Sequence, residues 1–187
     1  MNKAGIVLSA SVMITALMGD AYAFDAQRQG FQAGIGIGAH TSVINQDNHA
    51  SPAFIESEKR VAVDIQIGYG FTNRIVGFLG GKGGSALVNG HAATVTITGA
   101  GGTIYWSDSA PSLYLTGIIG QGSLSLRDQD GEFADSGTGW LAGVGYEVSK
   151  GLHLELSHAR ANLVDPQNDA NKSAMTATYA TIKYVWY

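Results

Sequence analysis

Apolar side chains alternate with glycine or polar side chains in two unbroken stretches near the start of the chain. In residues 60–71 every second side chain is apolar, from Val61 to Phe71, and residues 31–40 follow the same rule. A period of two places successive side chains on opposite faces of a β-strand, whereas an amphipathic helix repeats every three or four residues. The sequence therefore predicts β-structure in which each strand has one apolar face.

Eight strands can be assigned in this way, and the connections between them alternate in length. The strands span residues 31–40, 60–71, 74–81, 94–106, 112–126, 138–148, 152–162 and 174–187. Four connections contain 11 to 19 residues (41–59, 82–93, 127–137, 163–173), and the three between them contain two to five (72–73, 107–111, 149–151). In an antiparallel up-and-down sheet all the long loops then lie at one end. This asymmetry is typical of transmembrane β-barrels of the bacterial outer membrane, with short periplasmic turns and long extracellular loops.

Length and composition narrow the class further. A chain of 187 residues holds eight membrane strands of about ten residues, whereas a sixteen-stranded porin does not fit. The formal net charge of -4 excludes a nucleic-acid partner. Because the chain has no cysteine, a disulfide framework, a thiol nucleophile and a cysteine-ligated metal site are excluded. We expect no cofactor, and the histidines and carboxylates form no recognised metal-ligand set.

The first 23 residues predict a secretory signal peptide. Lys3 is followed by an apolar stretch, residues 6–18, and then by the small-x-small cleavage site AYA at residues 21–23. The apolar stretch is shorter than the roughly 20 residues that a membrane-spanning helix needs. We therefore expect residues 1–23 to be removed and residues 24–187 to form one outer-membrane barrel domain.

The apolar face of the strands is assigned to lipid and the other face to the barrel interior. Soluble barrels also alternate, but here the second face consists of glycine, glutamine, alanine and a few charges, which suits the interior of a narrow eight-stranded barrel. Aromatic residues collect at strand ends near the short turns, as in an interfacial girdle. They are Tyr69, Phe71, Tyr105, Trp106, Tyr114, Tyr146, Tyr184 and Trp186.

The last segment fixes the register of these faces. If Trp186 and Tyr184 face lipid, Lys183 faces the interior and avoids a cost of roughly 2 to 4 kcal/mol for a charge in lipid. The same register predicts an interior network of charges, which must pair because an isolated buried ion is strongly unfavourable. Its predicted members are Arg60, Asp64, Glu147, His153, Glu155 and Lys183.

Three segments have patterns known from one bacterial family. They are TIKYVWY at residues 181–187, GTGWLAGVGYEVSKGLHLELS at 137–157 and APSLYLTGIIGQGSL at 110–124. In these segments the chain resembles the small eight-stranded outer-membrane barrels of Gram-negative bacteria, of the OmpX/Ail and opacity-protein type. That family usually ends in Phe, whereas here Trp186 is followed by Tyr187.

The resemblance implies a monomer in the outer membrane, in contact with outer-membrane lipid and lipopolysaccharide. It also implies a C-terminal signal that the barrel-assembly machinery reads, carried here by Ile182, Tyr184, Trp186 and Tyr187. The expected function is a structural or surface-interaction role, adhesin-like, through the long loops. The fold does not fix that function, and the sequence identifies no extracellular ligand.

Two other functions stay open at this point. A narrow pore or small-molecule conduit would use the interior, although paired charges should block it. A lipid-modifying barrel enzyme is suggested by Ser157 and His158 beside Glu155. Adjacent residues on a strand point to opposite sides of the wall, so Ser157 and His158 cannot share a proton. We therefore predict no catalytic residue and expect a protein that is not an enzyme.

Overall fold

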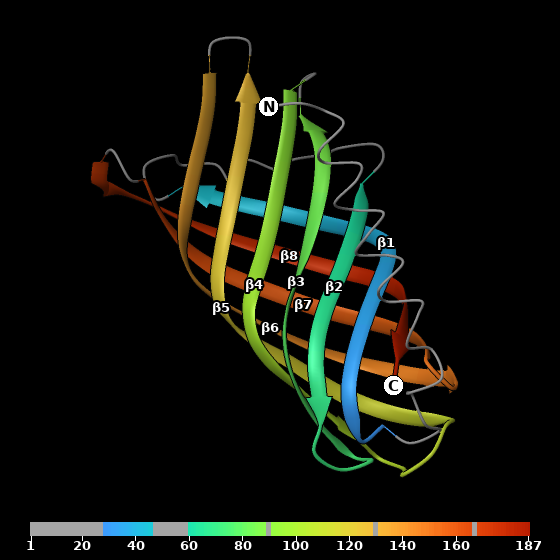
Figure 1. The fold of residues 1–187 in the computed structure, drawn as a ribbon. Helices are drawn as coiled ribbons and strands as arrows, with labels where there is room; N and C mark the ends of the chain where they lie inside the picture. The colour runs from blue at the N-terminus through green and yellow to red at the C-terminus, as the bar shows by residue number, and fades with distance from the viewer. Residues whose placement is uncertain (1–27, 47–59, 89–90, 129–130, 166–167) are drawn as a thin grey trace, which may run out of the picture.

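The computed structural model describes residues 28–46, 60–88, 91–128, 131–165 and 168–187. Within them, eight strands form one closed antiparallel barrel in chain order (Figure 1). The strands are β1 (Gly30–Gln46), β2 (Val61–Gly70), β3 (Ile75–Val88), β4 (His91–Tyr105), β5 (Ser112–Asp128), β6 (Gly131–Ser149), β7 (Leu152–Asp165) and β8 (Asn168–Trp186). Pairing of β1 with β8 closes the sheet, as full barrels do to remove open strand edges. The predicted all-β, eight-stranded up-and-down barrel is confirmed.

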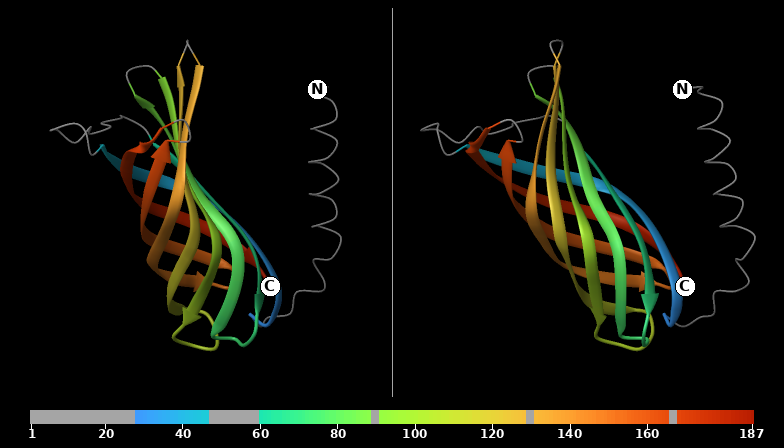
Figure 2. Two further views of the ribbon diagram at one scale, coloured as in Figure 1. Left: turned by 90° about the vertical axis from the view of Figure 1, so that its left-hand side faces the viewer. Right: turned by 60° about the vertical axis from the view of Figure 1, so that its left-hand side comes forward.

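The three short connections, β2–β3, β4–β5 and β6–β7, lie together at one end of the barrel, here called the turn end (Figure 2). The C-terminal residue lies there too, because Gly151 in the β6–β7 turn donates its N–H to the Tyr187 hydroxyl at 3.0 Å. No helix in the described part of the chain is long and apolar enough to cross a membrane. The predicted signal peptide, residues 1–23, lies outside the described residues.

The opposite end of the barrel is here called the hairpin end. The prediction of four long loops at this end is wrong for three connections, where the strands continue through most of the residues assigned to loops. Strand β3 reaches Val88 and β4 begins at His91, β5 reaches Asp128 and β6 begins at Gly131, and β7 reaches Asp165 and β8 begins at Asn168. These strands pair with each other to their ends, so their backbone groups bond in ladders and not with water. The fourth predicted loop starts as strand, since β1 extends to Gln46, and its residues 47–59 lie outside the described residues.

The polarity of the alternation reverses along the strands. Near the turn end of β4, Ile104 faces outward and is 62% exposed, whereas Thr103 faces inward and is 4% exposed. Nearer the hairpin end, Ile97 is buried inside the barrel and Thr98 faces outward. The predicted strand 94–106 already spans this change of sides. The missed extensions begin where apolar alternation is absent, as in the glycine-rich part of β3 that starts at Lys82.

The outer surface consequently has two zones. The apolar belt, at the turn end, carries exposed large apolar side chains from all eight strands, for example Ile65 on β2 and Ile119 on β5. The hydroxyl face, nearer the hairpin end on β3 to β6, consists of outward Ser85, Thr94, Thr96, Thr98, Ser123, Ser136 and Thr138. Hydroxyls bond across the strands of this face, and Thr96 Oγ1 lies 2.6 Å from Ser123 Oγ. The outer surface thus changes from apolar to polar along the barrel.

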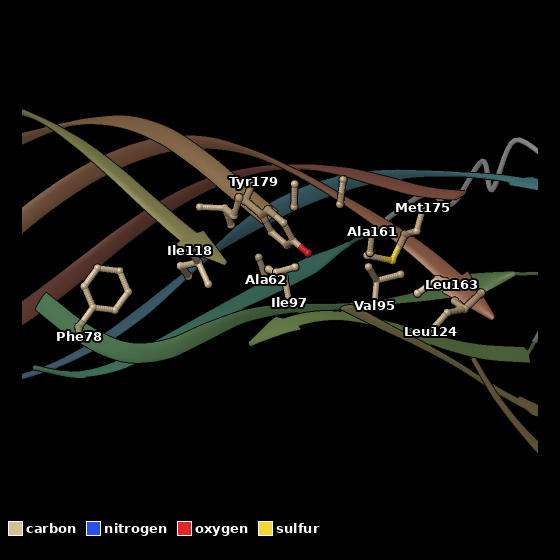
Figure 3. Packing of buried hydrophobic residues seen from close by; sticks show 13 residues of the cluster. Ala62, Phe78, Val95, Ile97, Ile118, Leu124, Ala161, Leu163, Met175 and Tyr179 are labelled. Carbon is tan, nitrogen blue, oxygen red and sulfur yellow. The ribbon is translucent and has the colours of Figure 1, made fainter. Parts of the chain in front are cut away.

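Behind the hydroxyl face the interior is packed with apolar side chains (Figure 3). Figure 3 shows Val95, Leu163 and Met175 gathered on one side of the cluster and Phe78 on the other, with Ile97 between them. Hydroxyls outside and aliphatic side chains inside are the polarity of a sheet that faces water. The barrel therefore combines a lipid-type zone and a water-type zone in the same strands.

Candidate functional site

An ion cluster, here called the first ion cluster, crosses the interior at the level of the apolar belt. Lys82 on β3 and Lys183 on β8 lie between Asp64 on β2 and Glu155 on β7, and all four side chains are buried. Lys82 Nζ is 2.6 Å from Glu155 Oε1 and 3.0 Å from Asp64 Oδ2. Lys183 Nζ is 3.0 Å from Glu155 Oε2 and 3.5 Å from Asp64 Oδ2. Two cations balance two anions, which is the condition for keeping ions in a barrel interior.

Uncharged side chains complete the hydrogen bonding of this cluster. Gln66 Oε1 accepts from Lys183 Nζ at 3.0 Å, and the Tyr114 hydroxyl donates to Glu155 Oε2 at 3.0 Å. Tyr114 can reach this position because residue 145 on β6 is glycine, and a Cβ at Gly145 would overlap the Tyr114 ring. The narrow barrel thus needs a missing side chain at Gly145 for Tyr114 to fit.

A second cluster, around Arg28, closes the turn end. Arg28 Nε donates to Glu147 Oε2 at 2.8 Å, and its Nη1 donates to the carbonyl oxygens of Asn73 at 2.8 Å and Ser107 at 2.7 Å. The guanidinium carbon lies 4.0 Å from the centre of the Tyr105 ring, in cation–π contact. Arg28 therefore ties the segment before β1 to the β2–β3 turn, the β4–β5 turn and β6.

The Glu147 carboxylate is shared by further groups of the same cluster. The Tyr187 hydroxyl donates to Glu147 Oε1, and the Gly151 N–H lies 3.3 Å from the same oxygen. His153 Nε2 is 3.7 Å from Glu147 Oε1. One buried carboxylate thus links the C-terminal residue, the β6–β7 turn, β7 and Arg28.

The rings of Tyr105, Tyr114 and His153 pack between the two clusters, with centroids 5.3 to 6.0 Å apart. Assigning Tyr105 and Tyr114 to the outer girdle was wrong, because they are 4% and 1% exposed. Their strand neighbours Ile104 and Leu113 take the outward positions, and alternation then turns the tyrosines inward. The other predicted girdle aromatics are exposed on the outer surface: Tyr69, Phe71, Trp106, Tyr146, Tyr184 and Trp186.

Ser157 and His158 lie on opposite sides of the β7 wall. Ser157 is buried in the interior, where its hydroxyl has no hydrogen-bond partner among the described residues. His158 is exposed on the outer surface, and its Nδ1 lies 3.0 Å from Thr178 Oγ1. A nucleophile and its base must be within hydrogen-bond reach of each other, and these two side chains are separated by the sheet.

The barrel was compared with known proteins. No protein-family model and no curated protein matches the chain. Ail, the attachment invasion locus protein of Yersinia pestis, matches with a TM-score of 0.54 at 14% identity, over 83% of this chain and 99% of Ail. Neisserial surface protein A matches with a TM-score of 0.57 at 15% identity, over 83% of this chain and 97% of that protein. The fold is that of the small eight-stranded outer-membrane barrels.

A third match to the outer-membrane barrel fold is Ail in complex with the heparin analogue sucrose octasulfate. Its TM-score is 0.50 at 14% identity, over 83% of this chain and 99% of that chain. At these identities the likeness establishes a common fold, and it transfers no ligand from Ail to this chain.

Within this outer-membrane barrel fold, the structure buries five of the six predicted network residues in the interior, and the sixth, Arg60, is half-buried. Asp64, Glu155 and Lys183 meet in the first ion cluster, and Glu147 and His153 meet in the Arg28 cluster. Arg60 is not brought into either cluster. Its Nη1 lies 3.4 Å from the Ser42 carbonyl oxygen, and four extended residues, about 13 Å of chain, separate it from Asp64.

Sequence reasoning missed the two cations Arg28 and Lys82. Lys82 lies in the segment GGKGG, which has no apolar alternation and was assigned to a loop, yet it is the direct cross-strand partner of Asp64 in the β2–β3 ladder. Arg28 precedes the first alternating segment. The charge count was a partial signal, because the predicted network set three acids against Arg60 and Lys183 and relied on a protonated His153 for balance.

The four residues of the predicted C-terminal signal divide between the two faces of the wall. Ile182, Tyr184 and Trp186 face outward in the apolar belt, and the Tyr184 and Trp186 rings pack edge to face with centroids 5.1 Å apart. Tyr187 is buried and belongs to the Arg28 cluster. Lys183, between the outward residues, points inward.

An exposed ion pair links two of the short turns outside the strands. Arg74 Nε lies 2.8 Å from Asp108 Oδ1, and both side chains are more than half exposed. The hydrogen bond from Arg74 lowers the pKa of the Asp108 carboxyl. An ion pair exposed to water contributes little to stability. Substitution of Arg74 is therefore a suitable control for substitutions in the buried ion pairs.

Proposed function

We propose that the protein is a monomeric outer-membrane barrel with a closed interior, and that its projecting hairpins form an adhesin-like surface for interactions outside the cell. The reversal of polarity along β4 carries this proposal. Outward Ile104 suits hydrocarbon and outward Thr98 suits water, so the boundary of the bilayer falls between them. In this orientation the turn end is periplasmic and the hairpin end is extracellular.

The apolar belt supports a membrane location on energetic grounds. A ring of exposed Ile, Leu and aromatic side chains on every strand is far larger than the scattered apolar residues of a soluble surface. Outer-membrane lipid and lipopolysaccharide would cover it. The outward aromatics Tyr184 and Trp186 are placed where an interfacial girdle and a signal for the barrel-assembly machinery would lie.

The projecting strands supply the surface for interactions. The β3–β4 and β5–β6 pairs extend beyond the belt as paired ribbons (Figures 1 and 2). Paired strands present side chains in a fixed order, which lowers the entropic cost of binding compared with flexible loops.

The closed interior argues against a pore. Two ion clusters and an apolar cluster occupy the interior, and each joins side chains from several walls of the barrel. We expect the refolded wild type to give no stepwise conductance in planar bilayers. The interior also offers no support for a catalytic site, since the hydroxyl of buried Ser157 has no hydrogen-bond partner among the described residues that could act as its base.

Membrane location is tested by fractionation and by heat-modifiability. The protein should separate with the outer membrane and migrate faster on gels when unheated than when boiled, because a closed barrel resists unfolding by detergent. Recovery from the soluble periplasm, or identical migration with and without boiling, would contradict the proposal.

The surface role is tested by shortening one hairpin. Replacing residues 126–133 by Asn-Gly joins β5 and β6 below their tip, where Ser125 pairs with Ala134, through a turn suited to a hairpin. Cells that display the wild type should attach to host-cell monolayers, and cells that display the shortened barrel should lose attachment while heat-modifiability stays intact. Equal attachment of both, or none by the wild type, would contradict the adhesin-like role.

A further inference from the structure

One outward site lies at the boundary between the apolar belt and the polar surface, on β6, β7 and β8. Among the described side chains, Trp140 is the last outward-facing large apolar residue of β6 in the direction of the hairpin end, and Thr138 follows it on the same face. On β7 the outward residues change from Leu156 to His158 and then to Arg160. Arg160 is the direct cross-strand partner of Trp140.

The Trp140 and His158 side chains are in contact, and Arg160 lies beside them at the position opposite Trp140 in the β6–β7 ladder. The Trp140 and His158 rings have centroids 6.2 Å apart at an interplanar angle of 58°. His158 Nδ1 lies 3.0 Å from Thr178 Oγ1 on β8, which fixes the imidazole between β6 and β8. The site therefore brings an indole, an imidazole and an arginine together on one face of the wall.

Charge sets this site apart from the rest of the outer wall. Among the described side chains on the outward faces of the eight strands, Arg160 is the only charged one, and no outward carboxylate lies near it. A guanidinium next to the hydrocarbon zone is unfavourable unless an anion or water meets it. Arginine binds phosphate through two parallel N–H donors, and tryptophan prefers the headgroup level of a membrane.

We propose that Trp140, His158 and Arg160 bind the phosphate of a lipid headgroup in the outer leaflet. The indole would lie against the acyl chains and headgroup boundary, while Arg160 and His158 donate to the phosphate oxygens. This inference rests on the proposed outer-membrane location and adds to it a defined lipid site on the β6–β8 side of the barrel.

The test compares the stability of the full barrel in two kinds of vesicle. Wild type is refolded into phosphatidylcholine vesicles and into the same vesicles containing bis-phosphorylated lipid A, and the urea midpoint is measured in each. We expect a higher midpoint with lipid A for the wild type, and a shift that shrinks as salt is added because the contact is ionic. Arg160→Gln should lose most of the shift, and Arg160→Lys, which keeps the charge, should retain part of it.

Two controls separate this site from general effects of charge. Arg74→Gln removes an arginine at the opposite rim that is already paired with Asp108, and it should keep the full wild-type shift. Inorganic phosphate added to the neutral vesicles should not reproduce the shift, because the site takes its phosphate from a membrane-bound lipid.

The outcomes that overturn the inference are distinct from those that overturn the proposed function. Normal insertion with an unchanged shift in Arg160→Gln would contradict the lipid site alone, and so would an equal shift with inorganic phosphate. Failure of the wild type to become heat-modifiable in either vesicle would contradict the outer-membrane proposal and the site together.

Discussion

Arg28 and Glu147 form a buried ion pair at the turn end of the barrel, although 119 residues separate them in the chain. Arg28 belongs to the segment before β1, and Glu147 lies near the end of β6. The Tyr187 hydroxyl donates to the same carboxylate. The beginning and the end of the described chain thus meet at one buried anion, and this contact exists only when the barrel is closed.

Removing Arg28 should therefore be costly. Arg28→Met leaves the Glu147 carboxylate buried without its cation, and loss of one partner of a buried pair costs on the order of 3 to 5 kcal/mol. The urea midpoint of the refolded barrel should fall accordingly, and the double variant Arg28→Met with Glu147→Met should recover much of the loss. A single variant as stable as the wild type would show that Arg28 does not hold Glu147. Arg74→Gln, at an exposed pair, should leave the midpoint unchanged within error.

Lys183 gives a second test, of the register of β8. Lys183→Met leaves Lys82 alone to neutralise Asp64 and Glu155, with an expected loss on the order of 3 kcal/mol. Tyr184→Met, at the neighbouring outward position, keeps an apolar side chain in the belt and should have a smaller effect. The urea midpoints of both variants in one detergent decide the matter. A higher midpoint for Lys183→Met than for the wild type would mean that Lys183 faces lipid.

Glycine at position 145 is expected to be required for the first ion cluster. A methyl group in Gly145→Ala would overlap the buried Tyr114 ring and displace its hydroxyl from Glu155, at a cost of about 1 to 3 kcal/mol. Gly102→Ala is the matched control, because its Cβ would meet the Val76 carbonyl oxygen at an ordinary 3.4 Å. Thermal unfolding in detergent should separate the two variants. Equal melting temperatures would contradict the packing of Tyr114 against β6.

The exposed pair in the turns predicts a local pH effect. The pKa of Asp108 is lowered by the hydrogen bond from Arg74, so the pair stabilises the fold above the ordinary aspartate pKa and loses this effect as the pH falls through the lowered pKa. NMR titration of the Asp108 carboxyl should give a pKa below the usual aspartate range in the wild type. Arg74→Gln should return it to that range, and a pKa that does not move would contradict the pair in solution.

The sequence was sufficient for the barrel because the alternation in β1 and β2 is regular. In β2 every outward residue from Val61 to Tyr69 is apolar, and this pattern alone gives the strand and its lipid face. The strand extensions toward the hairpin end were not predicted, because their sequences lack this regular alternation. In β3, outward Gly81 and Gly83 and inward Gly84 surround Lys82 and carry no apolar signal.

The interior was predicted only where a charge lies in a regular strand. Asp64, Glu155 and Lys183 sit among alternating apolar residues, so their face follows from the pattern. Lys82 is flanked by glycines and Arg28 precedes β1, so no period indicates where either side chain points. The inward orientation of Tyr105 and Tyr114 was not predicted, because the position of an aromatic residue at a strand end does not show which face of the sheet it occupies until the register is known.

Labelling of single cysteines on intact cells tests the central claim most directly, because the chain has no cysteine of its own. Three positions on β4 are replaced by cysteine one at a time: outward Thr96 on the hydroxyl face, inward Ile97 in the apolar cluster, and outward Ala100 at the belt. With a membrane-impermeant maleimide, Thr96→Cys should be labelled, and Ile97→Cys and Ala100→Cys should not. Labelling of Ile97→Cys would show an open interior, and equal labelling of Thr96→Cys and Ala100→Cys would contradict a membrane boundary between the two zones.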